Sequence, residues 1–131
     1  MCGIIGINSN RPVSSTIISS LKKLEYRGYD SAGIATLSNN EINEVKSEGR
    51  VDNLENNLLV QKMEGTIGIG HVRWATHGLP NSINAHPHSS EEVSVVHNGI
   101  IENSDELKKD LEAQGFKFKS QTDTEVITVL V

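Results

Sequence analysis

The chain opens with the heptapeptide MCGIIGI, residues 1–7, which holds three isoleucines and two glycines. This run is too short for a helix, and its isoleucines favour a buried strand. We therefore expect the chain to begin inside the hydrophobic core, with the N-terminus held by the strand that follows it.

Helical and strand patterns alternate after this first strand. An amphipathic helix is expected where apolar residues recur at helical spacing, at Val13, Ile17, Ile18, Leu21 and Leu24. Residues 34–37 and 42–46 flank the polar turn at 38–41 and predict a hairpin. Val51, Leu54, Leu58 and Leu59 predict a second helix that ends before Gly65. Residues 66–74 alternate as a strand, and the glycines in it imply close packing by another element.

The last third of the chain contains a long loop and more turn signals. Residues 76–90 lack periodicity and carry three of the five histidines, which is typical of a functional loop. A strand at 93–96 is expected to turn back at Asn98-Gly99, as in an Asn-Gly hairpin.

Two helices with capping-box spacing are expected after that hairpin. Asn103 and Glu106 begin the first, and Gly115 follows its C-terminus. Thr122 and Glu125 begin the second, whose apolar face has no partner at the end of the chain. We expect an α+β fold that is incomplete at its C-terminus.

Composition restricts the function. At 131 residues the chain corresponds to one domain or part of one. Twelve basic against 17 acidic residues give a net charge of −5, which argues against nucleic acid as a partner. The single cysteine, the absence of a leader and the absence of a membrane span predict a cytoplasmic protein. The glycines form no phosphate-binding motif, so we expect no nucleotide cofactor.

Cys2 is the most informative residue for chemistry. Removal of Met1 would leave a thiol and a free α-amine on one residue. The amine has an ordinary pKa of about 7.7–8.0 and can accept the thiol proton, so this nucleophile would carry its own base. The competing interpretation is a small buried hydrophobe at the chain end.

Three further positions suggest a site for a zwitterionic substrate. Asn98 with the Gly99 N–H could hold an oxyanion, although Asn-Gly alone is more often only a tight turn. Arg73 could bind a carboxylate with its guanidinium fork, and Asp123 in the first turn of the last helix could bind an ammonium group. Taken singly, such residues are more often a surface ion pair and a partner of the helix dipole.

The histidines raise a metal-binding alternative. His71, His77, His86, His88 and His97 include one close pair, at 86 and 88. Structural zinc sites usually include cysteines or a second paired motif, and the only cysteine is terminal, so we expect no metal. This argument does not apply to a site made of three histidines, which stays open as an alternative.

Several motifs together carry a resemblance to a known family. They are MCGIIG at 1–6, YRGYDSAG at 26–33, HVRWATHG at 71–78, NAHPH at 84–88, HNG at 97–99 and TDTE at 122–125. The chain resembles the N-terminal glutaminase domain of glutamine:fructose-6-phosphate amidotransferases, among the class II, N-terminal-nucleophile amidotransferases. The motifs occur in order and span nearly the whole chain.

The resemblance implies a four-layer αββα sandwich of antiparallel sheets, with residues 1–131 as a partial glutaminase domain. It also implies roles for individual residues. Cys2 would be the nucleophile, Asn98 and Gly99 the oxyanion hole, and Arg73 and Asp123 the contacts of the glutamine α-carboxylate and α-ammonium. Other family positions correspond to Thr76 and His77 lining the glutamine pocket, Trp74 closing the site, and Arg27 near the nucleophile.

The partners follow from the same resemblance. The chain would release ammonia from L-glutamine for transfer to fructose 6-phosphate on an isomerase domain that this chain lacks. A homodimer is expected through that other domain. The alternatives are the glutaminase domain of another class II enzyme, such as amidophosphoribosyltransferase, and a glutamine-binding remnant without turnover.

Overall fold

The main sheet of the protein has four antiparallel strands. The structure is a computed structural model that describes residues 2–74 and 79–131. The strands lie in the order β1-β4-β2-β3, with bounds β1 (Gly3–Asn8), β2 (Ser31–Ser38), β3 (Glu41–Glu48) and β4 (Ile67–Arg73). The hairpin expected between β2 and β3 is confirmed. Its two central residues, Asn39 and Asn40, have φ of 52° and 61°, the backbone that a two-residue hairpin turn requires.

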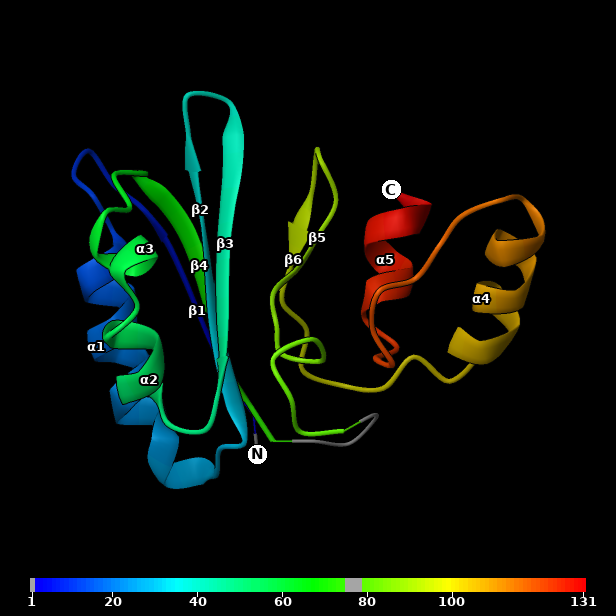
Figure 1. The fold of residues 1–131 in the computed structure, drawn as a ribbon, viewed down its shortest axis with the longest axis horizontal. Helices are drawn as coiled ribbons and strands as arrows, with labels where there is room; N and C mark the ends of the chain where they lie inside the picture. Colours follow the sequence, from blue (N-terminus) through cyan, green and yellow to red (C-terminus); the bar gives the residue numbers. More distant parts are fainter. Residues whose placement is uncertain (1, 75–78) are drawn as a thin grey trace.

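Three helices cover one face of this sheet (Figure 1). They are α1 (Ser14–Leu24), α2 (Val51–Glu55) and α3 (Leu58–Gln61), and the 3₁₀ turn η1 (Glu25–Arg27) follows α1. The buried side chains of α1 are Ile17, Ile18 and Leu21, so the expected amphipathic helix and its apolar face are confirmed.

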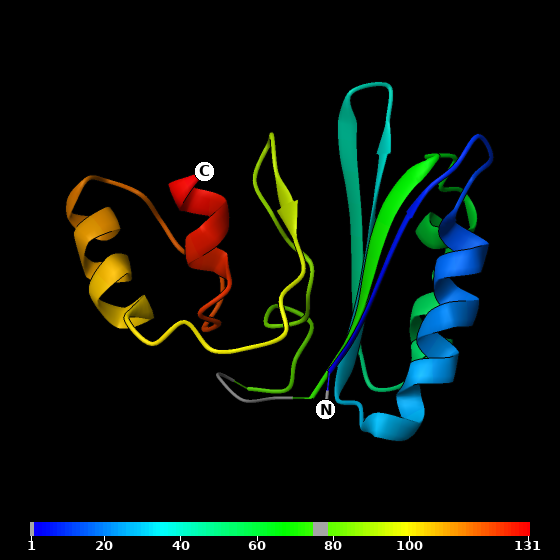
Figure 2. The ribbon, with the colours of Figure 1, turned by 180° about the vertical axis from the view of Figure 1, so that it is seen from behind.

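A second, smaller sheet and two more helices lie on the other side of the main sheet. Strands β5 (His88–Ser89) and β6 (Ser94–Val95) pair antiparallel. Beyond them lie α4 (Ser104–Ala113) and α5 (Glu125–Leu130), as both views show (Figures 1 and 2). The order of layers is helices, sheet, sheet, helices, so the expected α+β fold with antiparallel sheets is confirmed.

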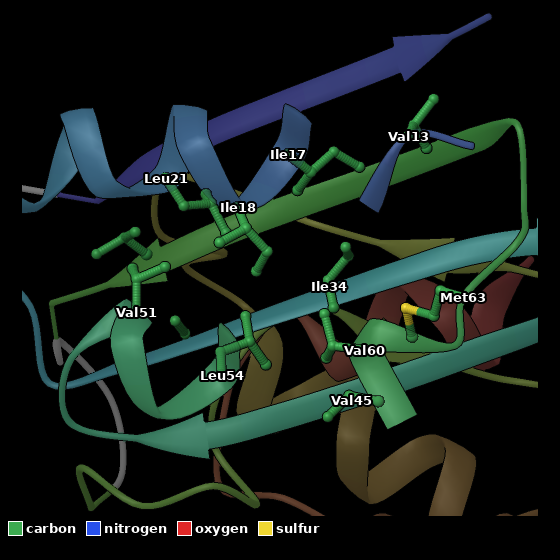
Figure 3. Close-up of a cluster of buried hydrophobic side chains, with 12 residues drawn as sticks. Val13, Ile17, Ile18, Leu21, Ile34, Val45, Val51, Leu54, Val60 and Met63 are labelled. Atoms are coloured by element: carbon green, nitrogen blue, oxygen red, sulfur yellow. The ribbon is translucent and has the colours of Figure 1, made fainter. Parts of the chain in front are cut away.

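The hydrophobic core lies between the main sheet and its helices (Figure 3). Glycines on β4 allow α1 to pack closely against the strand. A Cβ built on Gly70 would lie 2.5 Å from Ile17 Cγ2, and one on Gly68 would lie 2.7 Å from Ile17 Cδ1. The close packing expected from these glycines is therefore confirmed, and α1 is the element that requires it.

Strand register brings three segments together at one end of the main sheet. Gly3 pairs with Val72, and Ser31 pairs with Arg73. The start of β1, the end of β4 and the start of β2 therefore meet, as Figure 2 shows. Cys2, which precedes β1, is placed at this junction.

Two sequence predictions in the helices and turns are wrong. The helix expected from Val51 is instead two short helices, α2 and α3, with a break between Glu55 and Leu58. After this break Val60 is the residue of α3 that packs in the core, and Leu58 and Leu59 are exposed. Asn98-Gly99 is not a hairpin turn. The structure gives no strand at residues 100–101, because the chain after β6 leaves the sheet and runs to α4.

The helix starts also differ from their expected capping. Asn103 precedes α4, but its side chain makes no capping hydrogen bond. The last helix begins at Glu125 with Thr124 as its N-cap, so Thr122 does not cap it and Asp123 lies before the first turn. Glu125 instead accepts backbone N–H bonds from Lys119 and Ser120, both at 2.7 Å, and this loop contact displaces the capping box. Gly115 is confirmed after α4, with φ of +97°.

Within residues 2–74 and 79–131, none of the helices is both long enough and apolar enough to cross a bilayer.

The packing of α1 on β4 predicts unequal effects for two glycine substitutions. Gly70→Ala should lower the free energy of unfolding by about 1–3 kcal/mol, because the new methyl group would overlap Ile17. Gly6→Ala on β1 is the matched control. Its Cβ would lie 3.9 Å from Ile69 Cγ2, an ordinary contact, so stability should change by less than about 0.5 kcal/mol. Urea unfolding of both variants measures the difference, and equal losses would contradict this account of the packing.

Candidate active site

A pocket of about 500 Å³ lies where the strand ends of the main sheet face the loops before α4 and α5. Seven of the residues expected from the sequence line it: Cys2, Arg27, Arg73, Trp74, Asn98, Gly99 and Asp123. Thr76 and His77, also expected at the site, lie outside the described residues. The structure thus brings together residues that are up to 121 positions apart, Cys2 and Asp123.

The thiol of Cys2 is held against the backbone of Trp74. The Trp74 N–H donates to Sγ at 3.2 Å, and the thiol contacts the Trp74 carbonyl oxygen at 3.4 Å. Cys2 is the only cysteine of the chain, and its thiol is free and partly accessible to solvent.

Arg73 places a buried cation on the pocket wall. Its side chain is only 3% exposed, and Nη1 donates to the Leu79 carbonyl at 3.0 Å. Asp30 Oδ1 lies 3.8 Å from the same nitrogen. Burial lowers the pKa of Arg73, and the charges of Asp30, Cys2 and Asp123 oppose that shift. A guanidinium stays protonated in proteins, so the pocket holds a permanent positive charge.

Asn84 supports the segment that receives Arg73. This side chain is 1% exposed, and its Nδ2 donates to the Leu79 carbonyl at 2.9 Å, while its Oδ1 accepts the Gln121 N–H at 2.8 Å. Asn84 therefore ties the loop after residue 78 to the loop before α5, and so links the Arg73 wall to the Asp123 wall.

Asp123 adds a buried carboxylate to the pocket lining. It is 5% exposed, and Oδ2 accepts the Ile101 N–H at 2.7 Å. The Thr124 hydroxyl donates to Oδ1 at 3.4 Å, and that hydroxyl lies 3.1 Å from His97 Nδ1. These contacts leave carboxylate lone pairs available to a ligand, since each oxygen has about two acceptor sites.

Asn98 lies directly beside Cys2. Its Nδ2 donates to the Cys2 carbonyl at 3.1 Å, and its Oδ1 lies 3.0 Å from His71 Nε2. Gly99 has φ of +149°, and a Cβ there would lie 2.9 Å from His97 Nε2. Both the backbone conformation and the neighbouring imidazole therefore require glycine at this position.

Three histidines form a buried column behind this wall. The rings of His71 and His86 stack with centroids 4.2 Å apart, and His86 meets His88 edge-on at 4.8 Å. Burial lowers the pKa of His71 to about 4 and that of His88 to about 3, and it lowers the pKa of His86 as well. All three rings are therefore neutral at pH 7.

The metal alternative gains no support from this column. Among the described residues, no group of three or more His, Cys, Asp or Glu side chains is placed to hold a metal ion. The histidines instead stack and bond to neighbours, as His88 Nε2 does to Thr122 Oγ1 at 2.8 Å.

Several residues of the pocket were not expected as site residues. His86, His97, Ile100, Thr122 and Thr124 line it as well. Four of them lie within the motifs NAHPH, HNG and TDTE. Membership of these motifs was therefore the sequence signal that could have identified them as pocket residues. Ile100 carries no such signal, because an apolar residue after Asn-Gly also fits a strand.

The arrangement is chemically specific. The lining holds a guanidinium and a carboxylate, and the residue that carries the thiol is bonded to a primary amide. Such a pocket suits a small molecule with a carboxylate, an ammonium group and an electrophilic carbonyl.

Two solved enzyme structures superpose closely on this chain. Glutamine phosphoribosylpyrophosphate amidotransferase from B. subtilis, solved with ADP and GMP, superposes with a TM-score of 0.81 at 28% identity, over 99% of this chain and 29% of that one. A structure described as the allosteric regulatory enzyme of purine biosynthesis superposes with a TM-score of 0.82 at 30% identity, over 97% of this chain and 28% of that one.

Sequence comparisons agree with the structural ones. Residues 55–131 match the family described as glutamine amidotransferase domain, and the chain belongs to that family. It is 56% identical over 131 residues to the glutamine–fructose-6-phosphate aminotransferase (isomerizing) of Mesorhizobium japonicum, and 54% identical to that of Bradyrhizobium diazoefficiens. The match covers all of this chain and 22% of each relative, so the chain spans about a fifth of their length.

The neutral histidine column predicts that stability falls at mildly acidic pH. In the unfolded chain these imidazoles take up protons below their ordinary pKa of about 6.5, whereas in the fold His71 does so only near pH 4. Stability should therefore fall between pH 6.5 and 4, by about 2 kcal/mol per histidine from pH 7 to pH 5. Urea unfolding at the two pH values measures this.

His88→Gln serves as the control for this pH dependence. It removes one titrating ring, so the loss of stability between pH 7 and pH 5 should be smaller by the contribution of one histidine, about 2 kcal/mol. A free energy of unfolding that does not change between pH 7 and pH 5 would show that the rings are not buried as neutral groups.

Proposed function

We propose that this chain hydrolyses the side-chain amide of L-glutamine, with Cys2 as nucleophile. The observation that carries the proposal is the convergence of the Cys2 thiol, Arg73, Asn98 and Asp123 on one pocket. After removal of Met1, the α-amine of Cys2 takes the thiol proton, and Sγ attacks the amide carbon to give a tetrahedral intermediate. The proton passes to the leaving nitrogen, the C–N bond breaks, and ammonia departs from a γ-glutamyl thioester.

The second half of the reaction releases glutamate. Water, activated by the same α-amine, attacks the thioester carbonyl, and the C–S bond breaks to restore the Cys2 thiol. In both halves the carbonyl oxygen becomes negatively charged. Asn98 Nδ2 and the Gly99 N–H would hold that charge, and an oxyanion donor of this type contributes about 10²–10³-fold to kcat.

The two buried charges would recognise the ends of the substrate. Arg73 would bind the α-carboxylate, and Asp123 would bind the α-ammonium group. Trp74, whose ring packs on Gly28 and remains 52% exposed, would cover the bound substrate. Arg27, at the end of η1, adds positive charge to the rim of the pocket. Thr76 and His77 stay proposed pocket residues from the sequence motif.

The acceptor is proposed from the curated relatives. Their names state a transfer of the amino group from glutamine to fructose 6-phosphate, and their identity of 53–56% exceeds the 28–30% of the phosphoribosylpyrophosphate enzyme and its counterpart. We therefore propose that residues 1–131 supply part of the glutamine site of an enzyme of this kind. In such an enzyme an isomerase domain would receive the ammonia, and the same domain would form a homodimer.

Intact mass spectrometry of the full chain after exposure to an electrophilic glutamine analogue tests the nucleophile. We expect a mass without Met1 and with a single adduct, because Cys2 is the only cysteine. Cys2→Ala should give no adduct and no glutamate release. Turnover retained by Cys2→Ala would overturn the proposal, and a protein that loses Met1 but forms no adduct would favour the glutamine-binding remnant or a different ligand.

Substrate analogues test the two charged contacts separately. Arg73→Lys keeps the charge but loses the bidentate fork, so KM for glutamine should rise about 10–100-fold with little change in kcat. This variant should discriminate less than wild type between glutamine and 4-aminobutanamide, which lacks the α-carboxylate.

Asp123→Asn is the matched variant for the ammonium contact. It should lose discrimination between glutamine and glutaramate, which lacks the α-amine, and retain discrimination against 4-aminobutanamide. If Asp123→Asn instead loses discrimination against 4-aminobutanamide and Arg73→Lys against glutaramate, the two contacts are exchanged. If neither variant changes discrimination against either analogue, neither residue contacts the substrate.

A further inference from the structure

His71 is a buried polar residue next to the proposed site that has no role in the reaction described above. It lies on β4, is fully buried, and pairs across the sheet with Ile4 on β1 and Gly33 on β2. Its Nε2 lies 3.0 Å from Asn98 Oδ1, whereas its Nδ1 has no hydrogen-bond partner within the described part of the chain. A buried histidine at the centre of a sheet needs an explanation, because apolar residues occupy such positions at lower cost.

The direction of each hydrogen bond follows from chemistry. The Cys2 carbonyl can only accept, so the amide nitrogen of Asn98 must face it, as the 3.1 Å contact shows. The amide oxygen of Asn98 then faces His71, and an oxygen can only accept. His71 Nε2 therefore carries the proton and donates it to Asn98 Oδ1.

The ring of His71 is itself held in place. His86 stacks on it with an interplanar angle of 18°, and Gly33 lies against the backbone of His86 so closely that a Cβ would come within 1.9 Å of the His86 carbonyl oxygen. The imidazole thus has little freedom to rotate away from Asn98. A donor fixed in this way keeps the amide of Asn98 in one of its two orientations.

We propose that His71 is a positioning residue that orients the Asn98 amide so that its NH₂ group faces the oxyanion. The inference rests on the proposed function, in which Asn98 stabilises that oxyanion. One hydrogen of Nδ2 is used by the Cys2 carbonyl, and the second remains for the substrate oxygen. Without the His71 donor, only the contact with the Cys2 carbonyl holds the amide in this orientation. The amide then presents Oδ1 to the pocket more often, and the lone pairs of that oxygen repel the developing charge.

A double-mutant cycle in the full chain tests the coupling. His71→Leu removes the donor, and we expect kcat to fall about 10–100-fold while KM for glutamine stays within about threefold, because only the transition state carries the oxyanion. His71→Leu combined with Asn98→Ala should be no slower than Asn98→Ala alone, within about threefold, since His71 acts through Asn98.

Two polar substitutions separate positioning from loss of the fold. His71→Gln places an amide N–H close to the position of Nε2 and should restore most of kcat. His71→Asn reaches only as far as Nδ1 and should behave like His71→Leu. Both bury an amide of similar polarity, so a purely structural role of His71 predicts similar rates for them, and that result would overturn the proposal.

An inhibitor that mimics the intermediate gives a second readout. Glutamate γ-semialdehyde forms a thiohemiacetal with a cysteine thiol, and its oxygen would occupy the place of the oxyanion. Its affinity should fall in His71→Leu in proportion to kcat, whereas the affinity for glutamate should not change. Loss of affinity for both ligands would indicate a damaged pocket and would count against a positioning role.

The outcomes distinguish this inference from the proposed function. If Asn98→Ala leaves kcat unchanged, the oxyanion role fails, and the role of His71 fails with it. If Asn98→Ala lowers kcat but His71→Leu does not, or if their effects multiply in the double variant, only the positioning role is overturned.

Discussion

Strand β1 pairs with β4 from Gly3 opposite Val72 to Asn8 opposite Ile67, and the position of Cys2, the proposed nucleophile, depends on this pairing. Cys2 directly precedes the first paired residue, so the pairing at Gly3 keeps it near the end of β4. Its thiol and carbonyl meet Trp74 and Asn98 as a result. The pairing in turn depends on the glycines of β4, which let α1 pack against the sheet.

The buried polar residues around the pocket are the part of the structure whose burial costs the most free energy. Arg73, Asp123, Asn84 and His71 are each at most 5% exposed, and burial of a polar group costs free energy unless its hydrogen bonds are made. Backbone groups at 79 and 101 and the side chain of Asn98 satisfy most of these groups. These contacts fix the polar groups before a ligand arrives, and groups held in this way need no reorganisation when charge develops.

The neutrality of the histidine column fits the same pattern. A protonated ring beside Arg73 would add a second buried cation near the pocket, whereas neutral rings can donate and stack without charge. His71 bonds to Asn98, and His88 bonds to Thr122 beside Asp123. The column therefore connects both polar walls of the pocket to the central strands of the main sheet.

Local pattern was enough to predict β1, α1, the β2–β3 hairpin, β4 and the residue types of the site, because periodicity and turn residues act within a few positions. It failed at Asn98-Gly99, where Asn98 bonds to the distant residues Cys2 and His71 and no hairpin forms. It also failed at Thr122, where Glu125 bonds to the loop at 119–120 and the capping box does not form. The family motifs identified which residues belong together. Only the tertiary structure decided that His71 meets Asn98 and that Asn84 and Arg73 share the Leu79 carbonyl, since these contacts join separate segments of the packed chain.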